Sequence, residues 1–345
     1  MAKGKVGIVG LGIMGGAFAR NLVAAGWRVV GYDIDAARRR AMARAGVEIA
    51  DDAKTLAAEV DTIITSLPKP AALDATVTAI IDARVRPRVI IEASTFTIDD
   101  KLEAERALRK AGHVMLDCPV SGTGAQAKVK DLVVYASGDR QAIRRLRPLF
   151  AGFARAVHDL GAFGNGSRMK YVANLLVAIN NVASAEAMVL GLKAGLDAQT
   201  VFDMVRSGAA NSRVFELRAP MMVEDRYDGA SMKMSVWQKD MAVIGGFARQ
   251  LRCPTPMFDA TVPVYAKAMR SGHSEHDTAA VCASRPALRP STIASALATL
   301  LMATRRFATY FMRLPLPNAP RSCTARANPA NSGRSLRIAR RSPLA

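Results

Sequence analysis

The stretch VGIVGLGIMG at residues 6–15 decides the fold of this chain. Its first four residues are typical of a buried strand, and the Ala/Leu-rich residues after Gly15 are typical of a helix. A second strand is expected to end at Asp33, eighteen residues past Gly15. The spacing G-x-G-x-x-G is common by itself, but between a strand and a helix it predicts a dinucleotide-binding βαβ unit.

The glycines of this turn have separate expected functions. Gly10 permits the tight turn, Gly12 lets the backbone approach a pyrophosphate, and Gly15 lets the helix pack close to the sheet. The free N–H groups and the partial positive charge at the helix N-terminus favour phosphates. The predicted cofactor-binding residues of the turn are Gly10, Leu11, Gly12, Ile13, Met14 and Gly15. A glycine turn that binds no ligand stays an alternative.

The residue at the end of the second predicted strand bears on the choice of cofactor. Asp33 can accept hydrogen bonds from both hydroxyls of a ribose, and its charge would repel a 2′-phosphate. This favours NAD over NADP. Three arginines at residues 38–40 weaken that preference, so NADP is not excluded.

Short apolar runs alternate with segments of helical composition up to about residue 160. The predicted strands lie at residues 5–10, 28–33, 61–67, 88–93, 113–117, 132–137 and 156–160. Such alternation predicts an α/β fold with a parallel, doubly wound sheet, the Rossmann arrangement. Beyond residue 164 the pattern is helical. It predicts helices at residues 167–195, 197–207, 232–250 and 257–271, and the first is long enough to leave one domain and enter another.

These patterns divide the chain into an NAD(P)-binding Rossmann domain at residues 1–163, an all-helical domain at 164–283 and a tail at 284–345. Of the 48 basic residues, 11 are arginines of the tail, which has no lysine and no acidic residue. The other 37 face all 29 acidic residues, for a net charge of +8. The tail is expected to be disordered. An artefactual or out-of-frame C-terminus, or an arm that binds nucleic acid, would have the same composition.

Composition excludes several classes of protein. Half of the residues are hydrophobic, which rules out disorder throughout. The four cysteines form no C-x-x-C pair, so neither a disulfide scaffold nor a metal site is expected. No apolar run reaches the ~18 uninterrupted residues of a membrane span, and the N-terminal apolar stretch runs into the glycine turn, unlike a signal peptide. A reducing, cytoplasmic location is therefore the default expectation.

A second stretch with loop character is DCPVSGTGAQA at residues 117–127. Its glycines expose backbone N–H groups, and Ser121 and Thr123 add hydroxyl donors. Such a loop can cradle a carboxylate. Taken alone, the stretch could equally be an ordinary turn.

A third stretch, GNGSRMKYVAN at residues 164–174, begins the long predicted helix. Lys170 and Asn174 are four residues apart and therefore share one face of that helix. A lysine at such a position is usually a solvated surface residue. Its place beside a glycine-rich turn, on the helix that links two domains, favours a catalytic role instead.

The three motifs together resemble the β-hydroxyacid dehydrogenases. This family includes 3-hydroxyisobutyrate dehydrogenase and tartronate semialdehyde reductase and is related to 6-phosphogluconate dehydrogenase. The matches run in order along residues 4–283 and comprise the glycine turn, Leu67-Pro68, Ser94-Thr95, residues 117–122, Gly164, Gly166, Lys170, Asn174 and Lys239-Asp240. The chain departs from the family pattern at Thr123, where a second glycine is usual, and the last family helix, which starts near Asp277, loses its pattern by Ser284.

The resemblance implies an NAD(P)-dependent oxidoreductase that transfers a hydride between the nicotinamide and a small, 3-hydroxyisobutyrate-like β-hydroxy acid. It implies Lys170 as general acid and base, with a pKa lowered by burial and by a neighbouring cation such as Lys239. The implied substrate-binding residues are Ser121, Gly122, Thr123 and Asn174. The implied contacts of the nicotinamide half are Leu67, Pro68, Thr95 and Lys239.

The resemblance also implies a homodimer or homotetramer assembled through the helical domain, without fixing the number. It does not identify the hydroxy acid. One alternative is an imine reductase-like enzyme of the same superfamily, and another is a non-catalytic dinucleotide-fold protein that binds nucleic acid through its tail. Such proteins generally lack, or are expected to lose, the catalytic lysine, so Lys170 argues against both.

Overall fold

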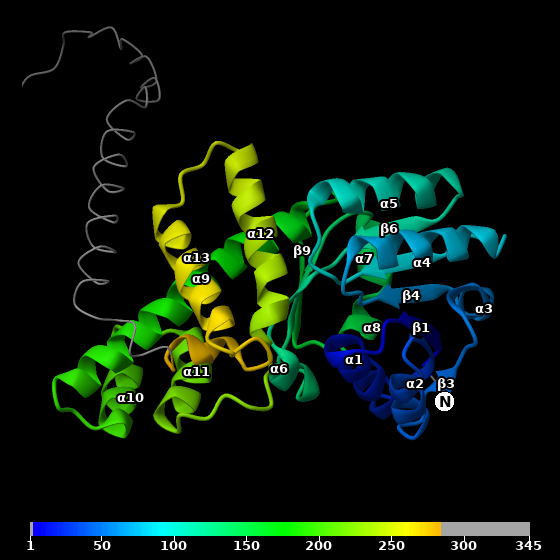
Figure 1. Ribbon diagram of the computed structural model, residues 1–345. Coiled ribbons are helices and arrows are strands. Elements are labelled where there is room, and N and C mark those ends of the chain that lie inside the picture. Colours follow the sequence, from blue (N-terminus) through cyan, green and yellow to red (C-terminus); the bar gives the residue numbers. More distant parts are fainter. Residues whose placement is uncertain (1–2, 284–345) are drawn as a thin grey trace, which may run out of the picture. The chain divides into compact units, whose positions relative to one another are not determined.

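The computed structural model of the protein describes residues 3–283. The alternatives for residues 284–345, namely a disordered tail, a nucleic-acid arm or an artefactual C-terminus, lie outside the described residues. An N-terminal Rossmann domain with a parallel sheet is followed by a helical C-terminal domain, and the long helix α9 (Asn165–Lys193) stands between them in the chain (Figure 1). This confirms the predicted fold class.

The first sheet has six parallel strands in the order β3-β2-β1-β4-β5-β6. Its strands are β1 (Lys5–Val9), β2 (Arg28–Tyr32), β3 (Glu48–Ile49), β4 (Thr62–Thr65), β5 (Val89–Glu92) and β6 (Val114–Asp117). The chain order reverses between β1 and β4, where Gly7 lies opposite Ile63. Ligands of open parallel sheets bind at the carboxyl ends of the strands beside such a switch point. The glycine turn that follows β1 lies at this edge.

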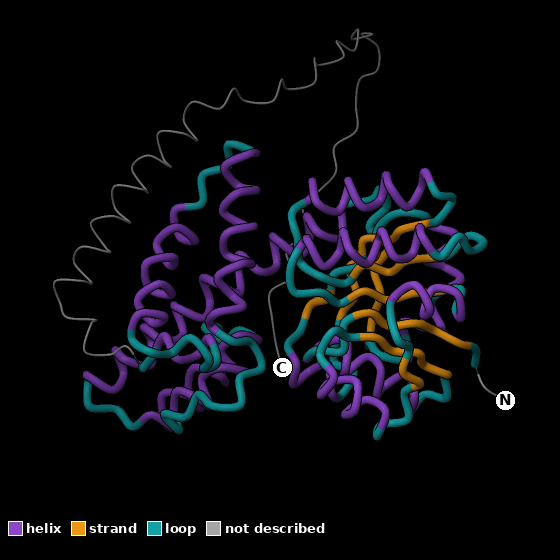
Figure 2. The backbone as a smooth tube through the Cα atoms, turned by 45° about the vertical axis from the view of Figure 1, so that its right-hand side comes forward, coloured by secondary structure: helices purple, strands orange, loops and turns teal. Residues whose placement is uncertain are grey.

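Helices cover both faces of the first sheet (Figure 2). They are α1 (Ile13–Ala24), α2 (Ala36–Ala43), α3 (Ala53–Glu59), α4 (Pro70–Asp82) and α5 (Ile98–Lys110). Successive side chains of a strand point to opposite faces. Ile64 therefore joins the core cluster of Phe18 in α1, whereas Ile63 joins that of Leu73 in α4. Burial on both faces explains why the centres of these strands are apolar on both sides.

The last two predicted strands do not extend the parallel sheet, contrary to the interpretation of the alternation. They are β8 (Val133–Ala136) and β9 (Ala156–Asp159) of a separate sheet, in which β7 (Val120–Ser121) is antiparallel to β8. The segment between β7 and β8 holds only the short helix α6 (Gly124–Lys128) and a turn. This is shorter than a parallel crossover requires. The helices α7 (Arg140–Arg145) and α8 (Arg147–Phe150) separate β8 from β9.

The helical domain is built around α9. Its other elements are α10 (Ala198–Ser207), α11 (Arg213–Val223), α12 (Met234–Gln250), α13 (Pro256–Arg270) and a 3₁₀ turn (Thr278–Val281). All of them pack against α9, and their core includes Phe215, Trp237 and Tyr265. The helix α11 contains Pro220, which explains why the sequence pattern did not predict it.

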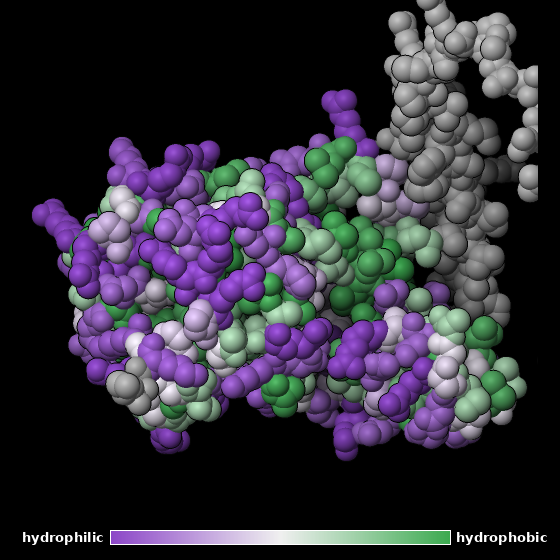
Figure 3. Space-filling view, turned by 180° about the vertical axis from the view of Figure 1, so that it is seen from behind, coloured by the Kyte–Doolittle hydropathy of each residue, from purple (hydrophilic) through white to green (hydrophobic). Residues whose placement is uncertain are grey.

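The helix α9 has one buried and one exposed apolar face. By length and composition alone it could cross a membrane, but the core helix of a soluble protein passes the same test. Met188 is buried in the helical core, whereas Met169, Val172, Leu176 and Leu190 are exposed. In the view from behind, hydrophobic side chains gather over the helical part of the molecule (Figure 3). We therefore assign α9 as the core helix of its domain, with an additional exposed apolar stripe.

Candidate active site

The turn after β1 requires glycine at two positions. Gly10 has a left-handed backbone (φ +93°), and a Cβ there would lie 2.2 Å from the carbonyl oxygen of Ser66. A Cβ on Gly15 would lie 1.9 Å from the carbonyl oxygen of Gly10. Both distances are far shorter than van der Waals contact. A side chain at Gly10 would push the turn away from the loop after β4, and one at Gly15 would push α1 away from the turn.

Gly12 is different because the space beside it is open. The nearest atom to a Cβ at this position would be a guanidinium nitrogen of Arg38, 3.5 Å away. The helix α1 begins directly after Gly12, and no side chain caps its first turn. Its first N–H groups are therefore available to a ligand. Open space in front of free N–H groups at a helix N-terminus fits a pyrophosphate.

Asp33 ends the β2 segment beside the glycine turn and is only 5% exposed. One carboxylate oxygen accepts the N–H of Leu11 at 2.7 Å, and the other accepts the N–H of Asp35 at 2.8 Å. Oδ1 keeps a second lone pair for a ribose hydroxyl, whereas Oδ2 also accepts a hydrogen bond from Nη1 of Arg38. The guanidinium of Arg38 lies 3.4 Å from the same carboxylate. A cation therefore stands within reach of the group that was expected to repel a 2′-phosphate.

The loops after β4 and β5 meet at the same edge of the sheet. The N–H of Leu67 donates to Oγ of Ser94 at 2.8 Å. Nζ of Lys239, from α12, donates to the carbonyl oxygen of Thr95 at 2.7 Å and lies 5.1 Å from the centre of the Phe96 ring. Lys239 thus joins the helical domain to the loop after β5. Pro68, the next predicted cofactor contact, is exposed.

The predicted substrate loop follows β7 and touches the glycine turn. Gly122 has a left-handed backbone (φ +131°), and a Cβ there would lie 2.4 Å from Leu132. A Cβ on Gly124 would lie 2.4 Å from the side chain of Ile13. Ile13 belongs to the glycine turn, so the predicted cofactor and substrate segments are in direct contact at this point.

One expected donor of this loop is already engaged. The N–H of Thr123 donates to Oε1 of Gln126 at 3.0 Å, and Nε2 of Gln126 donates to the Asp131 carboxylate at 3.0 Å. In this conformation the N–H of Thr123 is therefore not available to a substrate carboxylate. The reason is local, because Thr123 stands directly before α6 and the side chain of Gln126 caps that helix.

Lys170 lies inside the protein, 8% exposed, on the second turn of α9. Its Nζ donates to the carbonyl oxygen of Val120 at 2.6 Å, directly before Ser121. Burial is the main cause that lowers the pKa of Lys170 to about 8; the charge of Asp240 opposes this shift, and the cations Lys239 and Lys101 contribute to it. Near neutral pH this amine can both accept and donate a proton, as general acid–base catalysis requires.

Asn174 lies one turn beyond Lys170 and is 4% exposed. Its Nδ2 donates to Oδ2 of Asp240 at 3.1 Å, and Oδ1 of Asp240 lies 3.4 Å from Nζ of Lys239. Burial raises the pKa of Asp240, whereas the neighbouring lysines lower it. Asp240 had been noted only as half of the Lys-Asp match and was not among the predicted site residues. Its place next to a lysine on an otherwise apolar helix was the available signal.

The predicted residues thus form two connected groups. The first group connects the glycine turn to α9 through Ile13, Gly124, Val120 and Lys170. The second group connects the cofactor loops to α12 through Leu67, Ser94, Thr95 and Lys239. Among residues 3–283 no group of three His, Cys, Asp or Glu side chains could hold a metal ion. The arrangement brings the uncapped N–H groups at the start of α1 and the buried amine of Lys170 to the two ends of the segment that contains the substrate loop.

Known proteins resemble this chain over both of its domains. A family profile described as the NAD binding domain of 6-phosphogluconate dehydrogenase matches residues 5–161. A second, described as NAD-binding of NADP-dependent 3-hydroxyisobutyrate dehydrogenase, matches residues 164–284. L-threonate dehydrogenase of Haemophilus influenzae is 30% identical over 281 residues, which cover 80% of this chain and 93% of that protein.

Solved structures agree with these matches. The crystal structure of 3-hydroxyisobutyrate dehydrogenase from Salmonella typhimurium is similar with a TM-score of 0.74 at 29% identity, covering 81% of this chain and 98% of that one. A structure of 3-hydroxyisobutyrate dehydrogenase from Mycobacterium tuberculosis with L-serine has a TM-score of 0.74 at 28% identity, covering 82% and 99%.

The fold and the edge that carries the site define an NAD(P)-dependent dehydrogenase. The chain belongs to the β-hydroxyacid dehydrogenase family, and it is an NAD(P)-dependent enzyme of the 3-hydroxyacid dehydrogenase type. This confirms the resemblance and the predicted cofactor class, NAD with NADP not excluded.

Proposed function

We propose that this enzyme oxidises the hydroxyl group of a small, 3-hydroxyisobutyrate-like β-hydroxy acid with Lys170 as the proton-transferring group. The observation that carries the proposal is the buried amine of Lys170, which is bonded to the residue directly before Ser121 and has a pKa lowered to about 8. In this proposal the amine would contact a substrate held by the Ser121–Thr123 loop. Asn174 on the same helix face supplies a second polar contact.

The residues around Lys170 would bind the substrate by its carboxylate. The hydroxyl of Ser121, the N–H of Gly122 and the remaining amide hydrogen of Asn174 are the donors for this group. The side-chain hydroxyl of Thr123 adds to the loop, although its N–H is taken by Gln126. A carboxylate fixed at these donors leaves the carbinol carbon near Lys170 and lowers the entropic cost of reaching the transition state.

In oxidation the neutral amine of Lys170 takes the hydroxyl proton. In reduction its ammonium form returns a proton to the carbonyl oxygen. The nicotinamide, when bound, accepts or supplies the hydride. The cofactor would be held by the glycine turn at residues 10–15, by Asp33 at the ribose, and by Leu67, Pro68, Thr95 and Lys239 at the nicotinamide half.

The proposal extends to the organisation of the chain. We assign residues 1–163 to cofactor binding and 164–283 to substrate binding and self-association. The exposed apolar side chains Met169, Val172 and Leu176 on α9 support a homodimer or homotetramer that covers them. The free cysteines Cys118 and Cys253 are compatible with a reducing, cytoplasmic compartment.

The experiment is an assay of NAD and NADP reduction with 3-hydroxyisobutyrate, L-threonate, L-serine, glycerate and 3-hydroxypropionate. We expect turnover with at least one of these acids, and we expect Lys170→Ala to abolish it while NADH still binds. Lys128→Ala is the matched control because Lys128 is an exposed lysine of α6, beside the substrate loop. Near-normal kcat in Lys170→Ala would remove Lys170 from the mechanism.

A further inference from the structure

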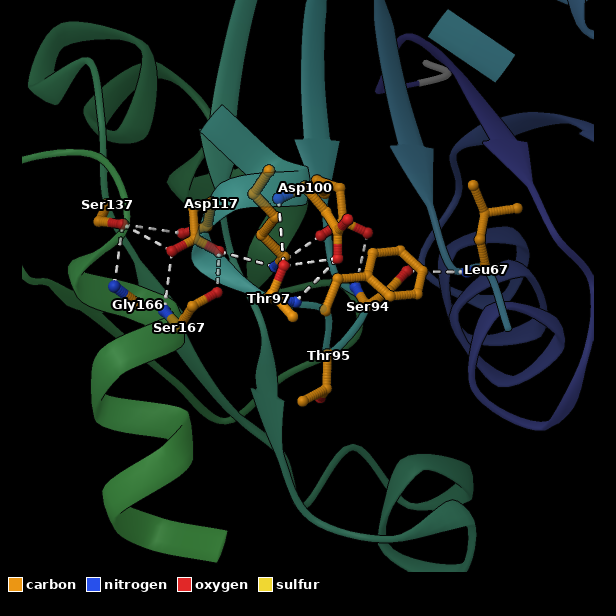
Figure 4. A network of polar contacts seen from close by, with 12 residues as sticks. Leu67, Ser94, Thr95, Thr97, Asp100, Asp117, Ser137, Gly166 and Ser167 are labelled. Atoms are coloured by element: carbon orange, nitrogen blue, oxygen red, sulfur yellow. Dashed lines mark hydrogen bonds and ion pairs between the residues drawn. The ribbon is translucent and has the colours of Figure 1, made fainter. Parts of the chain in front are cut away.

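A buried polar network runs beneath the proposed site. At its centre Lys101, 1% exposed, lies 2.8 Å from Asp117 and 2.6 Å from Glu92, and both carboxylates are fully buried. Burial alone would lower the pKa of Lys101, but the charges of Asp117 and Glu92 outweigh it and hold the pKa above its ordinary value. Lys101 is therefore a permanent cation. Figure 4 shows the network that surrounds it.

One end of this network caps α9. The residue before the helix, Gly164, has no side chain to cap it. Instead, the N–H of Ser167 donates to Oδ2 of Asp117 at 2.7 Å, and the hydroxyl of Ser167 donates to Oδ1 at 2.8 Å. The N–H of Gly166 donates to Oγ of Ser137 at 2.9 Å, and this hydroxyl also lies 3.3 Å from Asp117 (Figure 4). The carboxylate of Asp117, at the end of β6, thus caps the N-terminus of α9.

The close fit at this end leaves the helix little room to move. A Cβ on Gly166 would lie 2.3 Å from the carbonyl oxygen of Tyr135 and 2.7 Å from that of Asp117. The first turn of α9 is therefore pressed against the ends of β6 and β8. Lys170 follows Ser167 by three residues, less than one helical turn.

The segment 117–120 holds α9 at two points. Asp117 binds the helix at Ser167, and the carbonyl oxygen of Val120 accepts Nζ of Lys170. The same short segment therefore fixes both the start of the helix and the amine on its second turn. A shift of the first turn would move Lys170 relative to the loop that begins at Ser121.

The other end of the network reaches the loops assigned to the nicotinamide half. Glu92 accepts the N–H of Ser94 at 2.9 Å, and Oγ of Ser94 accepts the N–H of Leu67 at 2.8 Å (Figure 4). Lys101 thus connects, through two carboxylates, the loops after β4 and β5 to the first turn of α9. The sequence did not predict that these residues contact one another.

We propose that Asp117, held by its ion pair with Lys101, is a positioning residue that fixes the start of α9 and thereby the amine of Lys170 relative to the cofactor loops. The proposal rests on the proposed function of Lys170. Asp117 does not touch Lys170, so its effect passes through Ser167 and the helix. The charged groups that face Lys170 itself are Asp240 and Lys239 from α12 and Lys101 from α5.

The test compares Ser167→Ala and Asp117→Asn with the control Ser184→Ala. Ser184 is also buried on α9, but its hydroxyl donates only to the carbonyl oxygen of Asn180 in the same helix. For each full-length protein we would measure kcat and KM with an acid from the panel above and the Kd of NADH. The pKa of Lys170 would be followed by competitive acetylation with acetic anhydride and peptide mass spectrometry.

We expect Ser167→Ala to lower kcat by about ten- to hundredfold because the amine is misplaced, with the Kd of NADH unchanged. The pKa of Lys170 should rise from about 8 toward its ordinary value, because a loosened first turn admits water. Ser167→Thr, which keeps the hydroxyl, should restore part of kcat. Ser184→Ala should behave as the native protein.

The pKa of Lys170 in Asp117→Asn distinguishes a loss of helix positioning from a loss of negative charge. Removal of a negative charge alone would lower the pKa of a nearby lysine, whereas a displaced helix would raise it. A native kcat and a native Lys170 pKa in Ser167→Ala overturn the proposal, even if Asp117→Asn fails to fold. Absence of turnover in the native protein with every acid would overturn the proposed function instead, and the acetylation pKa values would still decide whether Ser167 positions Lys170.

Discussion

Replacement of Lys170 by methionine is expected to stabilise the protein near neutral pH. The side chain is 8% exposed, and burial is the main reason that its pKa falls from 10.5 to about 8. This difference corresponds to about 3 kcal/mol of unfavourable free energy for the charged amine in the folded state. Methionine has a similar length and no charge. It also loses the hydrogen bond to Val120, about 1 kcal/mol, so the net gain is about 2 kcal/mol.

The expected stability difference between the native protein and Lys170→Met depends on pH. Below pH 8 Lys170 is charged in both states, so the native protein bears the full penalty. Between about pH 8 and 10.5 the folded state has lost the proton that the unfolded state still binds, so the native protein gains about 1.4 kcal/mol per pH unit. The advantage of Lys170→Met must therefore shrink as pH rises.

The assay is urea unfolding of both proteins at one fixed protein concentration, at pH 7 and at pH 9.5. Lys128→Met serves as the control, because Lys128 is exposed and its replacement should shift stability equally at both pH values. A stability difference for Lys170→Met that stays constant between pH 7 and 9.5 would refute the reasoning. It would mean that Lys170 is solvated and retains an ordinary pKa in the folded protein.

Two further variants test other parts of the site. Asp33→Ala should raise the KM of NAD more than that of NADP, because the carboxylate can accept ribose hydroxyls but faces the 2′-phosphate of NADP; equal changes would show that Asp33 does not contact the ribose. Asp240→Asn should shift the rise of the oxidation rate with pH to lower pH, because the Asp240 charge raises the pKa of Lys170. A pH–rate profile that stays in place would show that Asp240 does not act on the amine.

Most of the first sheet could be predicted from sequence because its strands are buried on both faces and punctuated by glycines. The runs that became β1, β2, β4, β5 and β6 have apolar residues at most of their central positions. The second sheet could not be separated from the first, since β8 and β9 have the same composition. What distinguishes them is the short connection after β7, and β7 itself has only two residues.

The proposed site was predictable to the extent that glycines and one lysine mark it. Glycine is required at positions 10 and 15 because a Cβ there would lie less than 2.5 Å from a backbone oxygen. A glycine motif in the sequence indicates such close approaches. The engagement of the Thr123 N–H by Gln126 was not predictable, because it depends on how α6 begins. The ion pairs of Lys101 could not be predicted from sequence either, because they join side chains that only the order of the strands in the sheet brings together.

The stability cost of Lys170 and its proposed catalytic value come from the same free energy. With a pKa of about 8, about one amine in ten is neutral at pH 7, whereas with the ordinary value of 10.5 it would be about one in three thousand. Burial therefore raises the reactive fraction about 300-fold, which equals the penalty of about 3 kcal/mol that the folded state bears. A protein in which Lys170 had only a structural role would gain by replacing it with an apolar residue. A variant in which Lys170 has an ordinary pKa but the oxidation rate at pH 7 is unchanged would contradict this relation. It would show that the burial of Lys170 does not contribute to catalysis.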